Sequence, residues 1–340
     1  MTEPRVPAPA AATAAAEPPA PLTFDRAAAI VERMREEIAH AVVAQGEVVE
    51  QVLVAFLAAG HVLLEGVPGL GKTLLVLALA RTFGGQFRRI QFTPDLMPSD
   101  ITGHTLYDMK SGEFRIRRGP AFTNLLLADE INRAPAKTQA ALLEVMQEQQ
   151  ISIEGRSFPL PPPFLTLATQ NPIELEGTYP LPEAQVDRFL LKVVIDYPDH
   201  DDEVALVRRV TEGRLGDRLD VSRVATVTTP EEVVAVQRLV AGVTVDERIV
   251  DYAVRLVRAT RSSVGLRVGA GPRGAIALVR AARALAVLSG RDFVLPDDVK
   301  RMARPALLHR VILSPEMEIE GYQPARAIAD VVDKVEAPRV

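Results

Sequence analysis

The sequence contains no cysteine and no tryptophan, and only 5% of its 340 residues are aromatic. Without cysteine the chain can form neither a disulfide framework nor a thiolate metal site, and lipid anchors attached through cysteine are excluded. The scarcity of aromatic side chains argues against a surface on which the bases of single-stranded nucleic acid stack.

The chain also lacks an excess of basic residues, because it has 44 acidic residues against 39 basic ones and a net charge of −5. We therefore expect no nucleic-acid partner. The longest uncharged apolar run, residues 51–64, is too short to cross a bilayer. The first 23 residues lack the basic start and apolar centre of a secretion signal. These absences predict a cytoplasmic protein without membrane insertion.

The length suggests about two domains. Residues 1–22 are nearly all Ala, Pro, Glu and Thr, a composition that predicts a disordered tail. We expect an α/β nucleotide-binding domain over residues 23–197 and a smaller all-α domain over 198–340. Five apolar stretches at βα spacing predict a parallel sheet with helices on both faces. They are His61–Leu64, Arg89–Phe92, Leu125–Asp129, Phe164–Ala168 and Leu190–Ile195.

Two segments depart from this alternation of strands and helices. Residues 105–118 and 150–158 each show two β-like halves around a glycine, which predicts hairpin inserts. The pattern leaves two interpretations open. The hairpins extend the edge of the sheet, or they protrude and touch a partner.

Residues 66–73 read Gly-Val-Pro-Gly-Leu-Gly-Lys-Thr and match the phosphate-binding pattern G-x-x-x-x-G-K-[ST]. An apolar strand precedes them and an apolar helix follows. This order directs unpaired backbone N–H groups and the helix dipole at an anion. The sequence therefore predicts a bound nucleoside triphosphate, contacted by Gly66, Pro68, Gly69, Leu70, Gly71, Lys72, Thr73 and Leu74.

Two adjacent acids, Asp129 and Glu130, end the apolar run that starts at Leu125. Nucleotide hydrolysis needs one carboxylate for Mg²⁺ and a second for the attacking water. We expect Thr73 and Asp129 to hold the metal, Lys72 to reach the β- and γ-phosphates, and Glu130 to activate the water. The alternative is a pair of solvated loop acids.

Asn171 follows another apolar run, in Thr169-Gln170-Asn171-Pro172. Its amide could hydrogen-bond both the γ-phosphate and the attacking water. A plain turn residue before proline is the alternative.

These motifs together resemble the MoxR-type branch of the AAA+ ATPases, from about residue 24 to the end. The resemblance rests on residues 66–73, 127–134 (LADEINRA), 168–172 (ATQNP) and 183–189 (EAQVDRF). It implies ATP and Mg²⁺ as cofactors. It also implies an AAA+ core with hairpin inserts followed by an all-α lid.

The resemblance further assigns roles to single residues. It implies that Asn171 is the first sensor, that Arg188 is an arginine finger reaching a neighbouring subunit's nucleotide, and that Arg273 is the second sensor. Val43 and Gln45 would lie near the adenine, although Ala44 replaces the usual glycine between them. The alternatives are a salt bridge from Arg188 to Asp187 or Glu183, and a capping or solvated Arg273.

A finger supplied to a neighbour implies a ring of identical subunits, commonly a hexamer. The resemblance suggests a chaperone-like ATPase that remodels, assembles or activates partner proteins, often ones with a von Willebrand factor A domain. The ATPase subunit of a metal chelatase is the alternative, and a nucleic-acid motor or loader is disfavoured by the acidic balance. A small GTPase is disfavoured because no Asn-Lys-x-Asp motif occurs.

Overall fold

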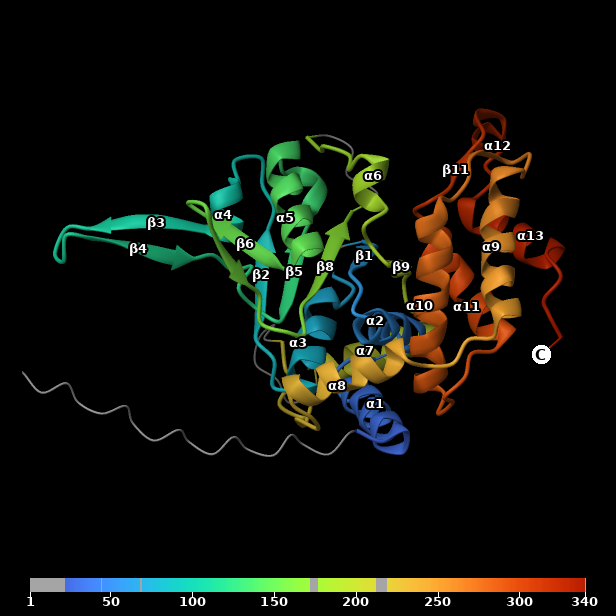
Figure 1. Ribbon diagram of the computed structural model, residues 1–340, viewed down its shortest axis with the longest axis horizontal. Coiled ribbons are helices and arrows are strands. Elements are labelled where there is room, and N and C mark those ends of the chain that lie inside the picture. Colours follow the sequence, from blue (N-terminus) through green and yellow to red (C-terminus); the bar gives the residue numbers. More distant parts are fainter. Residues whose placement is uncertain (1–21, 44, 68, 172–176, 212–218, 340) are drawn as a thin grey trace, which may run out of the picture.

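The computed structural model describes residues 22–339 except 44, 68, 172–176 and 212–218 (Figure 1). The predicted tail therefore lies outside the described residues apart from Leu22, and the predicted nucleotide contact Pro68 lies outside them entirely. No helix in the described part of the chain is both long enough and apolar enough to cross a membrane.

The centre of the molecule is a five-stranded sheet in which every neighbouring pair is parallel. The strand order is β2-β5-β8-β1-β9. The strands are β1 (Val62–Glu65), β2 (Phe87–Gln91), β5 (Leu125–Asp129), β8 (Leu165–Gln170) and β9 (Leu191–Val194). The predicted α/β fold with a five-stranded parallel sheet is thus confirmed. Because the strands are parallel, all their carboxyl ends meet at one edge.

Successive side chains of these strands enter two different cores, as the period of two in a strand requires. Leu64 and Leu127 belong to the core that also contains buried residues of α1, α2 and α3. Leu63 and Leu126 belong to the core with α4 and α5. These helices are α1 (Phe24–Ala39), α2 (Gly46–Leu57), α3 (Lys72–Thr82), α4 (Pro98–Thr102) and α5 (Ala136–Glu148). Two layers of helix therefore enclose the sheet.

The edge strand β2 departs from this arrangement. Arg88 and Arg89 are exposed, and Ile90 is the buried residue of the strand. The prediction that all five strands are covered on both faces is therefore wrong for β2. This strand lies at the edge of the sheet, next to β5 alone, where the layers of helix leave its two arginines exposed.

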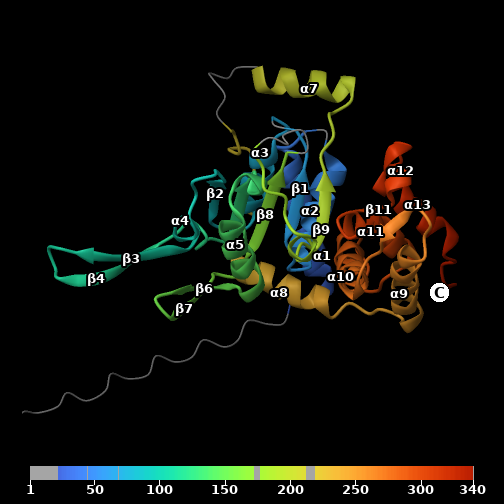
Figure 2. The same ribbon diagram turned by 90° about the horizontal axis from the view of Figure 1, so that it is seen from above.

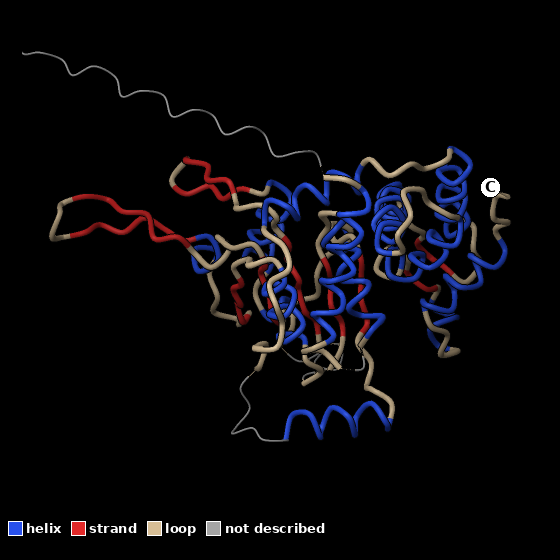
Figure 3. Tube along the Cα trace, turned by 90° about the horizontal axis from the view of Figure 1, so that it is seen from below, coloured by secondary structure: helices blue, strands red, loops and turns tan. Residues whose placement is uncertain are grey.

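Both predicted hairpins are present, and each forms its own two-stranded antiparallel sheet instead of extending the central one. The strands are β3 (Gly103–Asp108), β4 (Glu113–Arg118), β6 (Gln150–Ile153) and β7 (Arg156–Pro159). The β3–β4 hairpin projects far from the body (Figures 2 and 3). Tyr107 and Phe114 pack against each other on it, with ring centroids 5.2 Å apart, yet both stay exposed.

The C-terminal part is mainly helical, with α7 (His200–Thr211), α8 (Pro230–Ala241), α9 (Glu247–Arg261), α10 (Pro272–Leu288), α11 (Pro296–Leu307), α12 (Pro315–Ile319) and α13 (Pro324–Lys334). It also contains two short paired strands that the sequence analysis did not anticipate, β10 (Leu266–Val268) and β11 (Ile312–Leu313). Helix α10 contacts α2, α9 and α11, and α8 contacts α1 and α2. The helical part therefore packs directly on the α/β part, whereas α7 stands apart from both (Figure 2).

Candidate functional site

The phosphate-binding loop joins β1 to α3. Gly69 and Gly71 have φ angles of 88° and 74°, in the left-handed region that a Cβ disfavours. Gly71 is also the N-cap of α3, so the unpaired N–H groups of the first helical turn begin at Lys72 and Thr73. The backbone here requires glycine and has the geometry of an anion site at a helix N-terminus.

Lys72 lies against the inside of this loop, where its Nζ donates to the backbone oxygen of Gly66. Burial lowers the pKa of the ammonium group, and the carboxylates of Asp129, Glu130 and Glu65 act in the opposite direction. The ammonium is therefore held beside the loop with acidic groups around it, where phosphate oxygens can replace its contact with Gly66.

Asp129 is the last residue of β5, and neighbouring strands hold both of its carboxylate oxygens. Oδ1 accepts a hydrogen bond from Thr169 Oγ1 at 2.5 Å, and Oδ2 accepts one from Arg89 Nε at 3.1 Å. Each carboxylate oxygen has two lone pairs. Because Arg89 Nη2 also donates to Oδ2, at 2.5 Å, Oδ1 is the oxygen that keeps one lone pair for a metal ion or for a water on it.

The residues at this place fit Mg²⁺. The Thr73 hydroxyl lines the same cleft as the Asp129 carboxylate, and both supply the hard oxygen ligands that Mg²⁺ prefers. Among the described residues, no cluster of three or more acidic or histidine side chains could hold a metal ion alone. Magnesium bound with a nucleotide needs only one or two protein ligands, because phosphates and water supply the rest.

Glu130 follows at once, in an unusual backbone conformation. Its φ angle is 56°, which costs about 1–3 kcal/mol in a residue with a side chain and is found mainly at functional sites. Its N–H donates to Thr169 Oγ1 at 2.8 Å. Its carboxylate accepts from Gln91 Nε2 at 2.7 Å and pairs with Arg133 Nε at 3.0 Å. The same threonine hydroxyl therefore holds the carboxylate of Asp129 and the backbone of Glu130.

Asn171 and Gln45 complete the surroundings of the loop. Asn171 is buried one residue beyond the end of β8 and lines the cleft. Gln45 Nε2 donates to the backbone oxygen of Leu70 at 2.8 Å, while Gln45 Oε1 is buried and has no hydrogen-bond partner in the described part of the chain. Such an orphaned acceptor is suited to an amino group like that of adenine. Val43 lies half-buried two residues earlier.

The phosphate loop, both acids and Asn171 border one cleft of about 310 Å³ at the carboxyl edge of the sheet, a volume within the usual range for small-molecule sites. It is lined by Gly69, Gly71, Lys72, Thr73, Leu74, Arg89, Asp129, Glu130, Thr169, Asn171 and Leu219. Val43 and Gln45 lie outside its lining. Lining residues come from β2, from the ends of β5 and β8 and from the loop after β1, as expected where the strands of an open α/β sheet end.

The sequence analysis missed Arg89, Gln91, Thr169 and Leu219 as site residues. Arg89 and Gln91 lie on the edge strand, where polar residues in an otherwise apolar stretch were the available signal. Thr169 was part of the quoted ATQNP motif but received no role. Nothing in the local pattern around Leu219 marks it.

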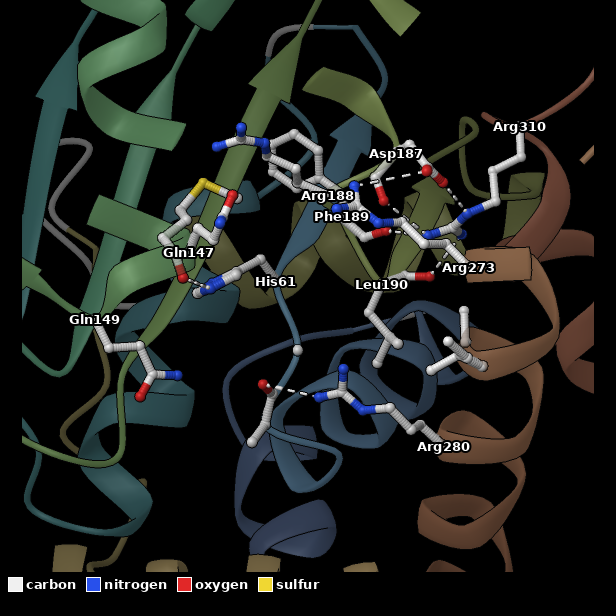
Figure 4. Close-up of a pocket in the computed structure, with 15 residues that line it drawn as sticks. His61, Gln147, Gln149, Asp187, Arg188, Phe189, Leu190, Arg273, Arg280 and Arg310 are labelled. Atoms are coloured by element: carbon white, nitrogen blue, oxygen red, sulfur yellow. Dashed lines mark hydrogen bonds and ion pairs between the residues drawn. The ribbon is translucent and has the colours of Figure 1, made fainter. Parts of the chain in front are cut away.

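Arg188 and Arg273 do not line this cleft. Both line a second cavity, of about 390 Å³ (Figure 4). Gly60 and His61, which come just before the amino end of β1, line it as well. A strand of four residues spans about 13 Å, so the two arginines lie at the opposite edge of the sheet from the phosphate loop.

The second cavity has a surplus of positive charge. Four arginines line it, at positions 188, 273, 280 and 310, and Asp187 is the only acidic side chain among its described lining residues. Asp187 pairs with Arg310 at 2.7 Å and with Arg273 at 3.7 Å. Arg188 Nη1 instead donates to the backbone oxygen of Leu143 at 3.0 Å. Asp187 therefore pairs with two arginines of the helical part, Arg273 and Arg310, and not with Arg188 as the alternative interpretation expected.

His61 adds no charge to this cavity. Its Nδ1 accepts from the N–H of Thr166 and its Nε2 donates to the backbone oxygen of Met146, both at 3.0 Å. Burial lowers the pKa of the imidazole to about 4, so it is neutral at pH 7 and serves to join strands and helix.

Comparison with known proteins agrees with this architecture. Residues 61–191 match the model of the ATPase family associated with various cellular activities (AAA), and residues 258–331 match an AAA lid domain. Chaperone MoxR1 of Mycobacterium tuberculosis is 44% identical over 319 residues, covering 91% of this chain and 83% of its own. Protein MoxR of Methylorubrum extorquens is 34% identical, covering 86% and 90%.

A solved structure shows the same fold. The crystal structure of a candidate ATPase from Cytophaga hutchinsonii has a TM-score of 0.84 and 42% identity, and it covers 92% of this chain and 96% of its own. The described elements, the two family models and relatives of this similarity over most of the chain lead to one conclusion. The chain belongs to the MoxR-type AAA+ ATPases.

Proposed function

We propose that this protein hydrolyses ATP with Mg²⁺ and uses the energy to remodel, assemble or activate partner proteins. The observation that carries the hydrolytic part is the cleft itself. Lys72 and Thr73 at a helix N-terminus, the acids Asp129 and Glu130, and the amide of Asn171 border one space of suitable size. We expect this activity in the cytoplasm, where ATP is available.

Each residue has a distinct task in this proposal. The loop N–H groups and Lys72 bind the phosphates, and Gln45 accepts from the adenine amino group. Thr73 and Asp129 would hold Mg²⁺, which neutralises charge on the β- and γ-phosphates when bound. Glu130 accepts a proton from the attacking water, and Asn171 orients the γ-phosphate. Thr169 positions both acids through its hydroxyl.

The arginines support hydrolysis between neighbouring copies. Arg188 and Arg273 lie at the other edge of the sheet from their own cleft, so we propose that both act in trans, on the nucleotide of an adjacent subunit. Their cavity has four guanidinium groups against one carboxylate, which suits the charge that spreads over the γ-phosphate oxygens. Repetition of this contact generates a closed ring, for which we propose six subunits.

The projecting hairpin supports a protein client. Tyr107, Met109 and Phe114 expose 56%, 86% and 75% of their surface near its tip. Exposed apolar side chains gathered on one projection are typical of contacts with other proteins. A partner with a von Willebrand factor A domain is the client class that we propose.

We expect Glu130→Gln to bind ATP as the wild type does but to lose turnover on the order of 10²–10⁴-fold, because the amide cannot accept the water's proton. Nucleotide binding is measured by calorimetry and turnover by phosphate release. Glu36→Gln, on the exposed face of α1, is the matched control and should keep full turnover. Hydrolysis by Glu130→Gln near the wild-type rate would show that another group is the base.

We expect Thr169→Val to lower turnover about 10- to 100-fold, the equivalent of about 1.5–3 kcal/mol for lost hydrogen bonds to a charged group. Thr166 provides a control on the same strand, since its hydroxyl is buried and has no partner among the described residues. Thr166→Val should therefore keep both stability and turnover. Equal losses in the two variants would count against a positioning role for Thr169.

We expect Lys72→Ala and Arg188→Ala to be inactive alone and to recover part of the activity when they assemble together. One variant supplies an intact finger and the other an intact phosphate loop, and a finger is worth on the order of 10³–10⁵ in rate. Lys72→Ala mixed with Glu130→Gln is the control, because neither has a complete cleft, and it should stay inactive. Native mass spectrometry verifies co-assembly. Absence of recovery in co-assembled subunits would refute action in trans.

A further inference from the structure

Arg310 was not part of any motif in the sequence analysis, yet among the described residues its side chain makes an extensive set of hydrogen bonds near the finger. It comes shortly after α11, within the part that matches the lid. Its guanidinium group donates five hydrogen bonds, four of them to the segment 187–190 and one to Ala306 O. Its side chain is 4% exposed. Most of the hydrogen bonds that this buried guanidinium donates therefore go to the segment that carries Arg188.

The acceptors of Arg310 lie on both sides of Arg188. Before it, Arg310 donates to Asp187 Oδ1 at 2.7 Å and to Asp187 O at 3.1 Å. After it, Arg310 donates to Phe189 O at 2.7 Å and to Leu190 O at 3.2 Å. A guanidinium is planar and carries its N–H groups in fixed directions, so these bonds fix the peptide groups that flank Arg188 (Figure 4).

His309 adds a second contact to the same segment. Its Nε2 lies 3.0 Å from Phe189 O, the carbonyl that also accepts from Arg310. Burial lowers the pKa of His309 well below its ordinary value, and the charge of Arg310 lowers it further. His309 is therefore neutral, and its single N–H donates to Phe189 O.

We propose that Arg310 is a positioning residue that aligns Arg188 for the neighbouring nucleotide and makes the finger segment move together with the lid. This inference rests on the proposed action of Arg188 in trans. A misplacement of about 1 Å can cost on the order of 10²-fold in rate, so the finger needs a rigid support. The α/β part contributes the contact of Arg188 with Leu143 O, and the lid contributes the bonds of Arg310 on both sides of Arg188. The position of the lid is therefore coupled to the competence of the finger.

The test uses Arg310→Lys, which keeps a positive charge but cannot donate in several fixed directions. Its matched control is Arg291→Lys. Arg291 is another partly buried lid arginine, which donates to both carboxylate oxygens of Asp298, at 2.9 and 2.6 Å, and does not line the second cavity. Each variant is assembled alone, with Lys72→Ala and with Arg188→Ala, and phosphate release and ATP binding are measured.

We expect Arg310→Lys alone to bind ATP normally and to hydrolyse it on the order of 10²-fold more slowly. Mixing with Lys72→Ala should restore activity, because that subunit supplies a well-placed finger to an intact cleft. Mixing with Arg188→Ala should not restore it, because neither subunit then has a working finger. Arg291→Lys should keep wild-type turnover alone.

Equal recovery in the two mixtures, or turnover by Arg310→Lys close to that of the wild type, would overturn the proposal. If Arg310→Lys does not fold, Asp187→Asn is tested in the same mixtures, and we expect the same results. This variant removes the carboxylate that accepts from Arg310 but keeps the backbone oxygens that also accept from it. The mixture of Lys72→Ala with Arg188→Ala is the reference. If this reference mixture does not recover activity, the action of the finger in trans is refuted as well. If the reference recovers but Arg310→Lys recovers equally with Lys72→Ala and with Arg188→Ala, only the positioning role of Arg310 is refuted.

Discussion

The common direction of the five central strands is the constraint on which the rest of the molecule depends. Parallel strands bring all their carboxyl ends to one edge, where the phosphate loop, Asp129, Glu130 and Asn171 border a single cleft. The amino ends meet at the opposite edge, where the segment 187–190 enters β9 and Arg188 lies with Arg273. One edge therefore collects the groups that we propose bind and cleave a triphosphate, and the other collects cations that lie away from that cleft.

Charge is distributed unequally between these two edges, which supports the association of copies that we propose. At the carboxyl edge, Asp129 accepts from Thr169 and Arg89, and Glu130 from Gln91, so both acids are oriented before nucleotide arrives. At the amino edge, Asp187 is shared by Arg310 and Arg273, which leaves a positive surplus. Buried guanidinium groups are costly to desolvate unless they are paired and hydrogen-bonded. The hydrogen bonds that Arg310 donates offset its desolvation free energy, and they also fix the backbone around Arg188.

Much of the fold and of the cleft could be predicted from the sequence, because the signals were local. The glycine loop, the apolar strands and the acids that end β5 each occupy a short stretch with a characteristic pattern. The features that the sequence analysis did not predict depend on contacts between residues far apart in the sequence. The exposed arginines of β2 follow from its place at the edge of the sheet. The strands β10 and β11 pair although more than forty residues of sequence separate them. The roles of Thr169 and Arg310 arise only when separate segments meet.

The central claim is that one copy's cleft is completed by the arginines of the next. The most direct measurement is the specific ATPase activity as a function of protein concentration, with the assembly state followed by analytical ultracentrifugation under the same conditions. The account predicts that activity per subunit falls on dilution together with the assembled fraction, while ATP binding to the separated subunits persists. Constant activity per subunit in solutions that contain only monomers would contradict it.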